Sequence, residues 1–359
     1  MTYAIRSATN GLTSAVAAVL YYSGALEFFH RLRNRDTLTV VVFHRVLSVD
    51  DPRSATALTE WTIGSEAFDA CLAFFRRHYN LVSLDAVMAA LAGTSRLPER
   101  SLLITFDDGF ADNRDYALPL LRKHGAEAVV FVSTDIIGQT DRLWAEDMLW
   151  AAQAGYLGDA DVRAVYRLTR GQAPSVDSEP AVLLREIVWR HPSGPPAGVE
   201  AVLGDRADLH RVREPRQMLD AEGISELARH GVAIGAHGKT HTALIHVDDL
   251  ADELETPRKR LGELLGPSAR PGIDALAFPH GVYTAEIVKR ALAAGYRLLF
   301  TVDDELVTLD GGRLCTPVIG RINVDGRRFA ANGRLRRDRL ALTLFTRRHS
   351  PSVPGAPCN

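Results

Sequence analysis

Short apolar runs alternate with helical segments along most of this chain. Runs rich in Val, Ile, Leu and Phe occupy residues 38–43, 102–106, 128–132, 232–236, 275–278, 297–302 and 318–322. Apolar residues at nearly every position are typical of strands buried on both faces of a parallel sheet. Residues 65–78, 113–124, 249–265 and 285–294 have helical periodicity. The alternation predicts an α/β fold whose parallel sheet is open or closed into a barrel.

One long stretch interrupts this alternation. Residues 138–220 contain no convincing strand, but 143–154, 159–170 and 180–191 read as helices. A chain of 359 residues is longer than one minimal barrel needs, and an insertion accounts for the excess. We therefore predict a barrel domain over residues 37–326 with a helical insertion at 138–220 between its third and fourth strands.

The two ends of the chain differ from the predicted barrel. Residues 1–36 hold an apolar stretch, followed by the basic cluster His30, Arg31, Arg33 and Arg35. The stretch is too polar for a confident transmembrane span, and it lacks the pattern of a cleavable signal. We predict an amphipathic helix, which either packs on its own domain or lies on a membrane surface; an uncleaved anchor or export signal is a third interpretation.

The segment 327–359 is predicted to be a tail, rich in Arg up to residue 348 and in Pro beyond it. Its arginines indicate either a solvated helix face or a contact with anionic lipid headgroups or a lipid pyrophosphate. Without a cleavable signal, we expect the protein on the cytoplasmic side, with membrane association as an added expectation.

Charge and cysteine content exclude several classes of protein. The chain has 42 Lys and Arg against 44 Asp and Glu, a net charge of −2, so no general attraction to nucleic acid is expected. Its three cysteines form no CxxC pair, so neither a disulfide framework nor a cysteine zinc site is indicated.

Polar clusters follow four of the predicted strands directly. They are His44, the Asp107-Asp108-Gly109 turn, the segment 237–241 (HGKTH) and the segment 279–281 (PHG). In parallel α/β folds the chemistry sits at the carboxyl ends of the strands, where these clusters fall.

The composition of two clusters indicates a metal site. His237 and His241 are four residues apart, which in a helical turn places both imidazoles on one face. Two neutral imidazoles and a carboxylate are a common zinc ligand set, and Asp107 and Asp108 are both candidates for the carboxylate. Adjacent carboxylates ionise together only near a cation, so one Asp would bind the metal and the other would act as base. An HxxxH spacing alone is often accidental, and Asp-Gly alone often marks a turn; their conjunction carries the hypothesis.

These motifs resemble those of a known family. The segments TFDDG (105–109), HGKTH (237–241) and FPHG (278–281) are similar to motifs of the polysaccharide deacetylases, the NodB-homology group of carbohydrate esterase family 4. The segment FHRV (43–46) resembles an element of the PgaB/IcaB-type exopolysaccharide N-deacetylases. The resemblance covers residues 40–324 without the insertion, and it implies a distorted (β/α) barrel.

The resemblance also implies roles for individual residues. Asp107 matches the general base, and Asp108, His237 and His241 match the metal ligands. His44 matches the general acid, and the backbone N–H around His280, between Pro279 and Gly281, matches an oxyanion donor that contacts substrate. Arg321 resembles a late arginine that pairs with Asp107 and orients it.

The sequence departs from the family pattern at two of these positions. Gly238 stands where the family has Ser or Thr after the first histidine, so Thr240 is the candidate to brace that turn. His280 stands where the family has tyrosine, so a stacking ring is lost and a second candidate acid, rival to His44, is gained. Trp144 lies on a helical face of the insertion, where it either packs in a core or forms a sugar-stacking surface.

Together these observations predict metal-dependent removal of the N-acetyl group from an amino sugar, within a polysaccharide or a lipid-linked glycan. Zinc suits the ligand set best, although cobalt, nickel or manganese could serve. Two alternatives stay open: an O-acetyl esterase or small-molecule amide hydrolase on the same scaffold, and an inactive glycan- or membrane-binding module.

Overall fold

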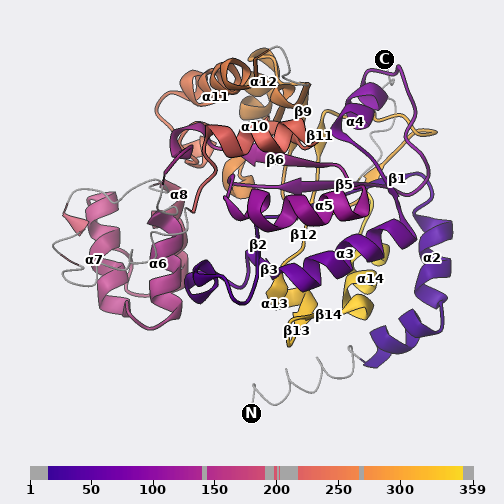
Figure 1. Cartoon of the computed structure of the whole chain (residues 1–359). Helices are drawn as coiled ribbons and strands as arrows, with labels where there is room; N and C mark the ends of the chain where they lie inside the picture. The colour runs from indigo at the N-terminus through magenta and orange to yellow at the C-terminus, as the bar shows by residue number, and fades with distance from the viewer. Residues whose placement is uncertain are drawn as a thin grey trace.

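The protein is described by a computed structural model that covers residues 15–139, 144–190, 198–199, 202, 217–266 and 271–350. Its centre is a curved, mainly parallel sheet with helices around it, as Figure 1 shows. The sequence prediction of a parallel α/β barrel with a helical insertion is confirmed by this arrangement.

In the described residues the main sheet has ten strands. Its order is β10-β1-β5-β6-β7-β8-β9-β11, with β12 paired to β1 and β4 to β5. The strands are β1 (Thr37–Phe43), β4 (Asn80–Leu81), β5 (Ser101–Phe106), β6 (Ala128–Val132), β7 (Ala233–Ala236), β8 (Ala275–Ala277), β9 (Leu298–Phe300), β10 (Val307–Thr308), β11 (Val318–Ile319) and β12 (Ile322–Asn323). All pairs along the path are parallel except β1 with β10.

The last predicted strand, residues 318–322, is two strands in the structure. Strand β11 pairs with β9 at one end of the sheet, and β12 pairs with β1 near the other end. Only Gly320 and Arg321 separate them, so this short segment passes from one edge of the sheet to the other and nearly closes the barrel. A side chain at position 320 would collide with the backbone, because a Cβ there would lie 2.3 Å from the carbonyl oxygen of Asp303.

Successive residues of each strand pack into two different cores, as the two-residue period of a strand requires. One set, which includes Val40, Leu103, Phe131 and Phe300, faces inward and packs with α4 (Leu84–Leu91). The other set faces outward and packs against the helices around the barrel. These helices are α3 (Ser65–His78), α5 (Leu118–His124), α10 (Ala221–Arg229), α11 (Leu250–Leu265), α12 (Ala285–Ala293) and α14 (Arg337–Thr346). Both faces of the strands are therefore buried, which explains their continuous apolar runs.

The insertion has a core of its own. Its helices α6 (Trp144–Gln153), α7 (Asp159–Arg170) and α8 (Pro180–Arg190) bury Met148, Val165 and Leu184 against one another. They lie together on one side of the barrel in Figure 1. Short strands β2 (Arg45–Leu47) and β3 (Thr62–Gly64) pair next to the barrel mouth.

Buried arginine ties the insertion to the barrel. The Arg45 guanidinium, directly after His44, is 1% exposed and lies 2.9 Å from Asp112 and 3.8 Å from Glu146 of α6. It also donates to Gln217 at 2.8 Å and lies over the ring of Phe110. A buried guanidinium requires such partners, so this contact fixes α6 beside the end of β1.

The two ends of the described chain pack together. Residues 15–22 are helical, and α2 (Ala25–Arg33) follows them and packs against α14. The ring of His30 stacks on Phe345 at a centroid distance of 4.1 Å, and Asn34 donates to the carbonyl oxygen of Phe345 at 2.9 Å. Burial lowers the pKa of His30 to about 3, so this histidine is neutral.

The segment 327–346, expected as a tail, is part of the body of the protein. It contributes α13 (Gly326–Phe329), β13 (Ala330–Ala331), β14 (Arg334–Leu335) and α14, while residues 351–359 lie outside the described residues. No helix among the described residues is long and apolar enough to cross a membrane.

This packing predicts that α14 is needed for stability. Phe345→Ala should lower the free energy of unfolding by about 3–5 kcal/mol, because a fully buried ring would leave a cavity between α2, α3 and α14. Leu342→Ala on the same helix, at a partly buried position, should cost clearly less. Urea unfolding measures both, and equal costs would contradict this description of the helix.

Candidate active site

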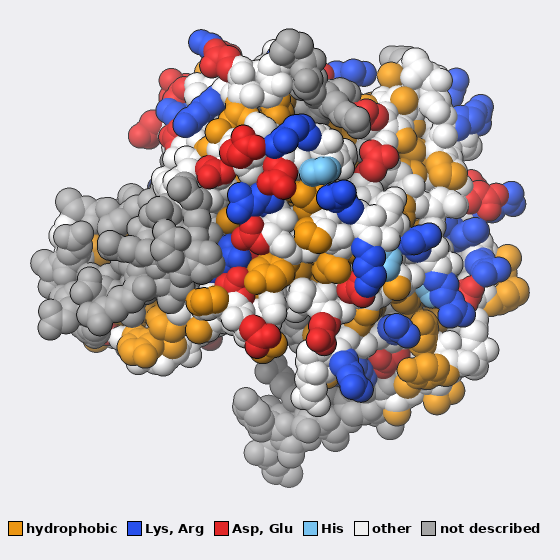
Figure 2. Space-filling model, in the orientation of Figure 1, with side chains coloured by type: hydrophobic (Ala, Val, Ile, Leu, Met, Phe, Trp, Pro, Cys, Tyr) orange, Lys and Arg blue, Asp and Glu red, His pale blue; other side chains and the backbone are white. Residues whose placement is uncertain are grey.

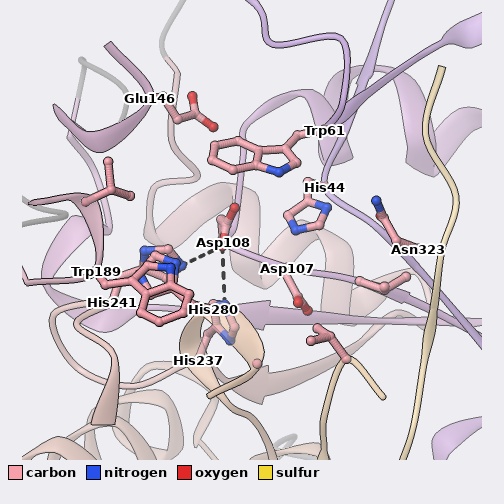
Figure 3. Close-up of a pocket in the computed structure, with 14 residues that line it drawn as sticks. His44, Trp61, Asp107, Asp108, Glu146, Trp189, His237, His241, His280 and Asn323 are labelled. Carbon is pink, nitrogen blue, oxygen red and sulfur yellow. Dashed lines mark ion pairs between the residues drawn. The ribbon is translucent and has the colours of Figure 1, made fainter. Parts of the chain in front are cut away.

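Polar side chains from the carboxyl ends of β1, β5, β7 and β8 converge on one cavity of about 290 Å³. Figure 3 shows the residues that surround it. The cavity is lined by Val42, His44, Trp61, Asp107, Asp108, Glu146, Val188, Trp189, His237, His241, His280, Gly281, Val302 and Asn323. The structure thus brings together seven of the predicted site residues around this cavity: His44, Asp107, Asp108, His237, His241, His280 and Gly281.

Three of these residues form a compact group of metal-ligand type. Nε2 of His241 lies 2.9 Å, and Nε2 of His237 3.3 Å, from the same Oδ1 of Asp108. One potential ligand atom from each residue lies within 4.8 Å of the others, and all three side chains are buried. A single ion could therefore contact all three, as the sequence predicts for Asp108, His237 and His241.

The orientation of His237 is set by a neighbouring strand. Its Nδ1–H donates to the carbonyl oxygen of Ala277 in β8 at 2.8 Å, which leaves Nε2 free to bind an ion. Ser133 Oγ, after β6, donates to the carbonyl oxygen of His237 at 2.6 Å. The ring and the backbone of this histidine are thus both held by hydrogen bonds.

The backbone at the site adopts a conformation that side chains usually avoid. Asp108, His241 and His280 have φ angles of 74°, 65° and 57°, which lie in the left-handed region. Residues held in this region cluster at active sites, where the surrounding structure supports the strain. Gly281 follows with φ 68°, and a Cβ there would lie 2.1 Å from Val302, so only glycine fits.

A buried carboxylate that the sequence analysis missed holds the turn between the two histidines. Glu253 of α11 is 6% exposed, and it accepts hydrogen bonds from Lys239 N at 2.8 Å and Thr240 N at 3.2 Å. Thr240 Oγ1 donates to its other oxygen at 2.6 Å. Thr240 therefore braces the turn as expected, and it does so through Glu253. A glutamate on a charged helix gives no sequence signal for this role.

The other adjacent aspartate has a different partner. Asp107 receives two parallel hydrogen bonds from Arg321, each 2.7 Å long, and both side chains are buried. Arg321 also donates to the carbonyl oxygen of Thr301 at 2.9 Å and lies near the rings of Phe131 and Phe300 inside the barrel. The predicted pairing of Arg321 with Asp107 is thus present. Burial alone would raise the pKa of Asp107, but the charge and hydrogen bonds of Arg321 bring that pKa below its ordinary value.

Both candidate acids, His44 and His280, face the cavity. The ring of His44 stacks near Trp61 at 6.1 Å, and its Nδ1 is buried without a partner among the described residues. Burial lowers the pKa of His44, while Asp108 and Asp107 act in the opposite direction. The ring of His280 lies 4.6 Å from that of His241, and burial together with the charge of His241 lowers the pKa of His280 well below its ordinary value.

The backbone around His280 suits an oxyanion donor. The N–H of Gly281 is occupied by the carbonyl oxygen of Phe278 at 2.8 Å, whereas within the described chain the N–H of His280 has no acceptor. Pro279, the first residue of this turn, is buried beside Gly238 and does not line the cavity.

Of the two interpretations of Trp144, packing in a core is the one that the structure shows. Trp144 is 6% exposed, packs in the core of the insertion, and does not line the cavity. The aromatic rings at the cavity are those of Trp61, from the loop before β3, and Trp189, at the end of α8. Helical spacing alone does not show which face of a helix points to a site, and Trp61 stands outside every motif.

A second cavity of about 710 Å³ adjoins the first and shares Trp61, Val188, Trp189 and His280 with it. Its remaining walls come mostly from α6, α7 and α8, with Glu60 and Arg327 from the barrel side. The insertion thus forms an extension of the active-site cavity.

The barrel, the buried Asp-His-His group and the adjacent paired aspartate define a hydrolase site of the NodB type. The sequence model of the family described as polysaccharide deacetylase matches residues 94–299, more than half of the chain. The chain therefore belongs to the polysaccharide deacetylase family and is an enzyme of the hydrolase class.

Individual relatives agree with this family. YxkH of Bacillus subtilis strain 168, which is assigned to the polysaccharide deacetylases, is 44% identical over 57 residues; the match spans 16% of this chain and 20% of YxkH. The structure resembles the deacetylase PplD of Streptococcus pyogenes in complex with acetate, with a TM-score of 0.54, 16% identity, and coverage of 86% of this chain and 99% of PplD. It also resembles IcaB from Ammonifex degensii, with a TM-score of 0.54, 18% identity, and coverage of 86% and 97%. These structural likenesses show a shared fold.

The role of Glu253 predicts a loss of metal affinity on its removal. Glu253→Gln should weaken Zn²⁺ binding by about 10- to 100-fold, because an amide cannot accept all the hydrogen bonds that hold the turn 238–241. Glu255→Gln, two residues further along α11 and exposed to solvent, is the matched control and should leave the affinity unchanged. Calorimetric Zn²⁺ titration measures both; equal affinities for the Glu253 variant and the unmodified protein would refute the assignment.

Proposed function

We propose that this enzyme hydrolyses the N-acetyl amide of an amino sugar with the aid of a divalent metal and releases acetate. The observation that carries the proposal is that two adjacent aspartates have different partners. Asp108 faces two imidazoles, while Asp107 is paired with Arg321. Family membership supports glycan deacetylation as the reaction class.

The residues present fit a metal ion. Two neutral imidazole nitrogens and one carboxylate oxygen point at a common place, and the Ala277 carbonyl fixes the tautomer of His237 that leaves Nε2 free. This donor set suits zinc best among the common divalent metals. When bound, the ion would act as a Lewis acid on water and on the acyl oxygen.

Asp107 is suited to act as the general base. It lies in the same cavity as the metal-ligand group but is held away from it by both nitrogens of Arg321. The arginine keeps the carboxylate ionised in a buried site, so Asp107 can accept a proton from the attacking water. The N–H of His280 can donate to the negative oxygen that develops on the acyl carbon.

Departure of an amine requires a proton, and we assign this role to His44. Burial lowers the pKa of His44 overall, but the neighbouring carboxylates of Asp108 and Asp107 offset part of this effect and favour its protonated form. His280 is less suited, because its ring lies against that of His241, where a cation would oppose a second positive charge. A site with an acid for the leaving group favours an amide over an ester, which cleaves without one.

The shape of the site supports a sugar substrate. Trp61 and Trp189 present apolar rings beside the metal-ligand group, and the adjoining larger cavity offers room for the part of the substrate next to the acetylated sugar. A polysaccharide chain and a lipid-linked glycan both satisfy this arrangement, and the resemblance of the segment FHRV (43–46) to the PgaB/IcaB-type enzymes supports an exopolysaccharide substrate.

Substitution of the two aspartates should separate catalysis from metal binding. Asp107→Asn should reduce acetate release from N-acetylated chitooligosaccharides by about 10²–10⁴-fold while zinc content is retained, because the base is lost and the ligands are intact. Asp108→Asn should lose zinc as well as activity. Full acetate release by Asp107→Asn would refute the assigned base, whereas unchanged biological function of this variant without acetate release would favour a non-catalytic module.

Removal of metal should abolish activity reversibly. Treatment with a chelator should eliminate acetate release, and added Zn²⁺ or Co²⁺ should restore it, since no other described group replaces a Lewis acid in the cavity. The same restored protein, given N-acetyl and O-acetyl sugars at matched concentration, should prefer the N-acetyl substrate. Faster release from the O-acetyl sugar would instead establish an esterase.

A further inference from the structure

The N-terminal helices expose an apolar face that points away from the protein. Ala17, Leu26 and His30 are at most 5% exposed and form the inner face against the body. The outer side chains are highly exposed: Val16 52%, Val19 67%, Leu20 36%, Tyr22 79%, Phe28 67%, Phe29 43% and Leu32 67%. These seven residues are called the outer face below.

The spacing of the outer face follows the helix. Val16, Val19 and Leu20 are spaced i, i+3, i+4, and Phe28 and Leu32 are spaced i, i+4, so each group forms one stripe. A surface helix normally has a polar outer side, whereas these helices expose large apolar side chains there beside the charged ones of Glu27 and Arg31. A contiguous exposed apolar patch of this kind marks a binding surface.

Two exposed arginines lie near the N-terminal helix. Arg77 of α3 and Arg337 of α14 are close enough to Tyr21 for their charges to act on its phenol, and Tyr21 adjoins the outer-face residues Leu20 and Tyr22 in the chain. Neither forms an ion pair with any described residue, whereas Arg31 and Arg35 pair with Glu27 and Glu99. Figure 2 shows hydrophobic and basic side chains together on the right-hand side of the molecule, where α2 lies in Figure 1.

We infer that the outer face binds peripherally to a membrane containing anionic lipids. Exposed Phe, Leu and Tyr side chains suit the boundary between headgroups and acyl chains, and the unpaired arginines suit anionic headgroups. A second copy of this chain fits less well, because a two-fold contact through this face would bring its arginines near one another.

Vesicle co-sedimentation of the full chain tests this inference. The protein should sediment with vesicles that contain phosphatidylglycerol, should bind those of phosphatidylcholine alone only weakly, and should be released by added salt. Phe28→Ser with Leu32→Ser should weaken binding by about tenfold or more, as should Arg77→Glu with Arg337→Glu. Both pairs replace exposed side chains, and melting temperatures verify that the fold is kept.

Two controls keep the result interpretable. Tyr156→Ser with Val176→Ser removes exposed apolar side chains from the insertion and should leave vesicle binding unchanged. Acetate release from a soluble oligosaccharide should be equal in all variants, so failure of this inference is separate from failure of the proposed function. The inference is overturned if binding does not depend on phosphatidylglycerol, or if the outer-face substitutions leave it intact. A dimer that these substitutions dissociate, without vesicle binding by the original chain, would assign the face to a second copy.

Discussion

Two adjacent carboxylates end the same strand inside a buried cavity, and the rest of the site depends on how their charges are balanced. Neighbouring buried carboxylates cannot both stay ionised without compensation. Arg321 neutralises Asp107 through two hydrogen bonds from inside the barrel. Asp108 faces two imidazoles, with which it forms the candidate metal-ligand group. In the proposed function each carboxylate would have its own cation, Arg321 for Asp107 and a divalent metal for Asp108, and each would take a different chemical role.

The backbone makes this separation possible. Asp107 directly follows β5 and continues its hydrogen bonding to β1, because its N–H donates to the carbonyl oxygen of Phe43, whereas Asp108 enters a left-handed turn. His241 and His280 reach the same cavity through similar left-handed turns after other strands. The positive charge that balances Asp107 comes from the segment that closes the barrel. Arg321 lies between β11, at one end of the sheet, and β12, which pairs with β1 near the other end. Fold and site are therefore joined at one residue.

Much of this organisation could be predicted from the sequence, because it depends on local patterns. Continuous apolar runs located the main strands, and polar clusters after them located Asp107, Asp108, His237 and His241. Other features depend on contacts between distant segments and leave no local pattern. Glu253 acts from a charged helix, Trp61 comes from a loop, and the division of residues 318–322 into two strands follows from barrel closure. Two interpretations of Trp144 stay open at the level of sequence, because helical spacing does not distinguish the face toward the insertion core, where this ring packs, from the face toward the cavity.

Anomalous X-ray diffraction from zinc-loaded crystals tests the central claim most directly. The account predicts one zinc peak about 2.0–2.2 Å from an oxygen of Asp108 and from Nε2 of His237 and His241, with Asp107 still paired to Arg321. A zinc ion that bridges both aspartates, with Arg321 displaced, would contradict it. A peak located away from these three ligands would contradict it as well.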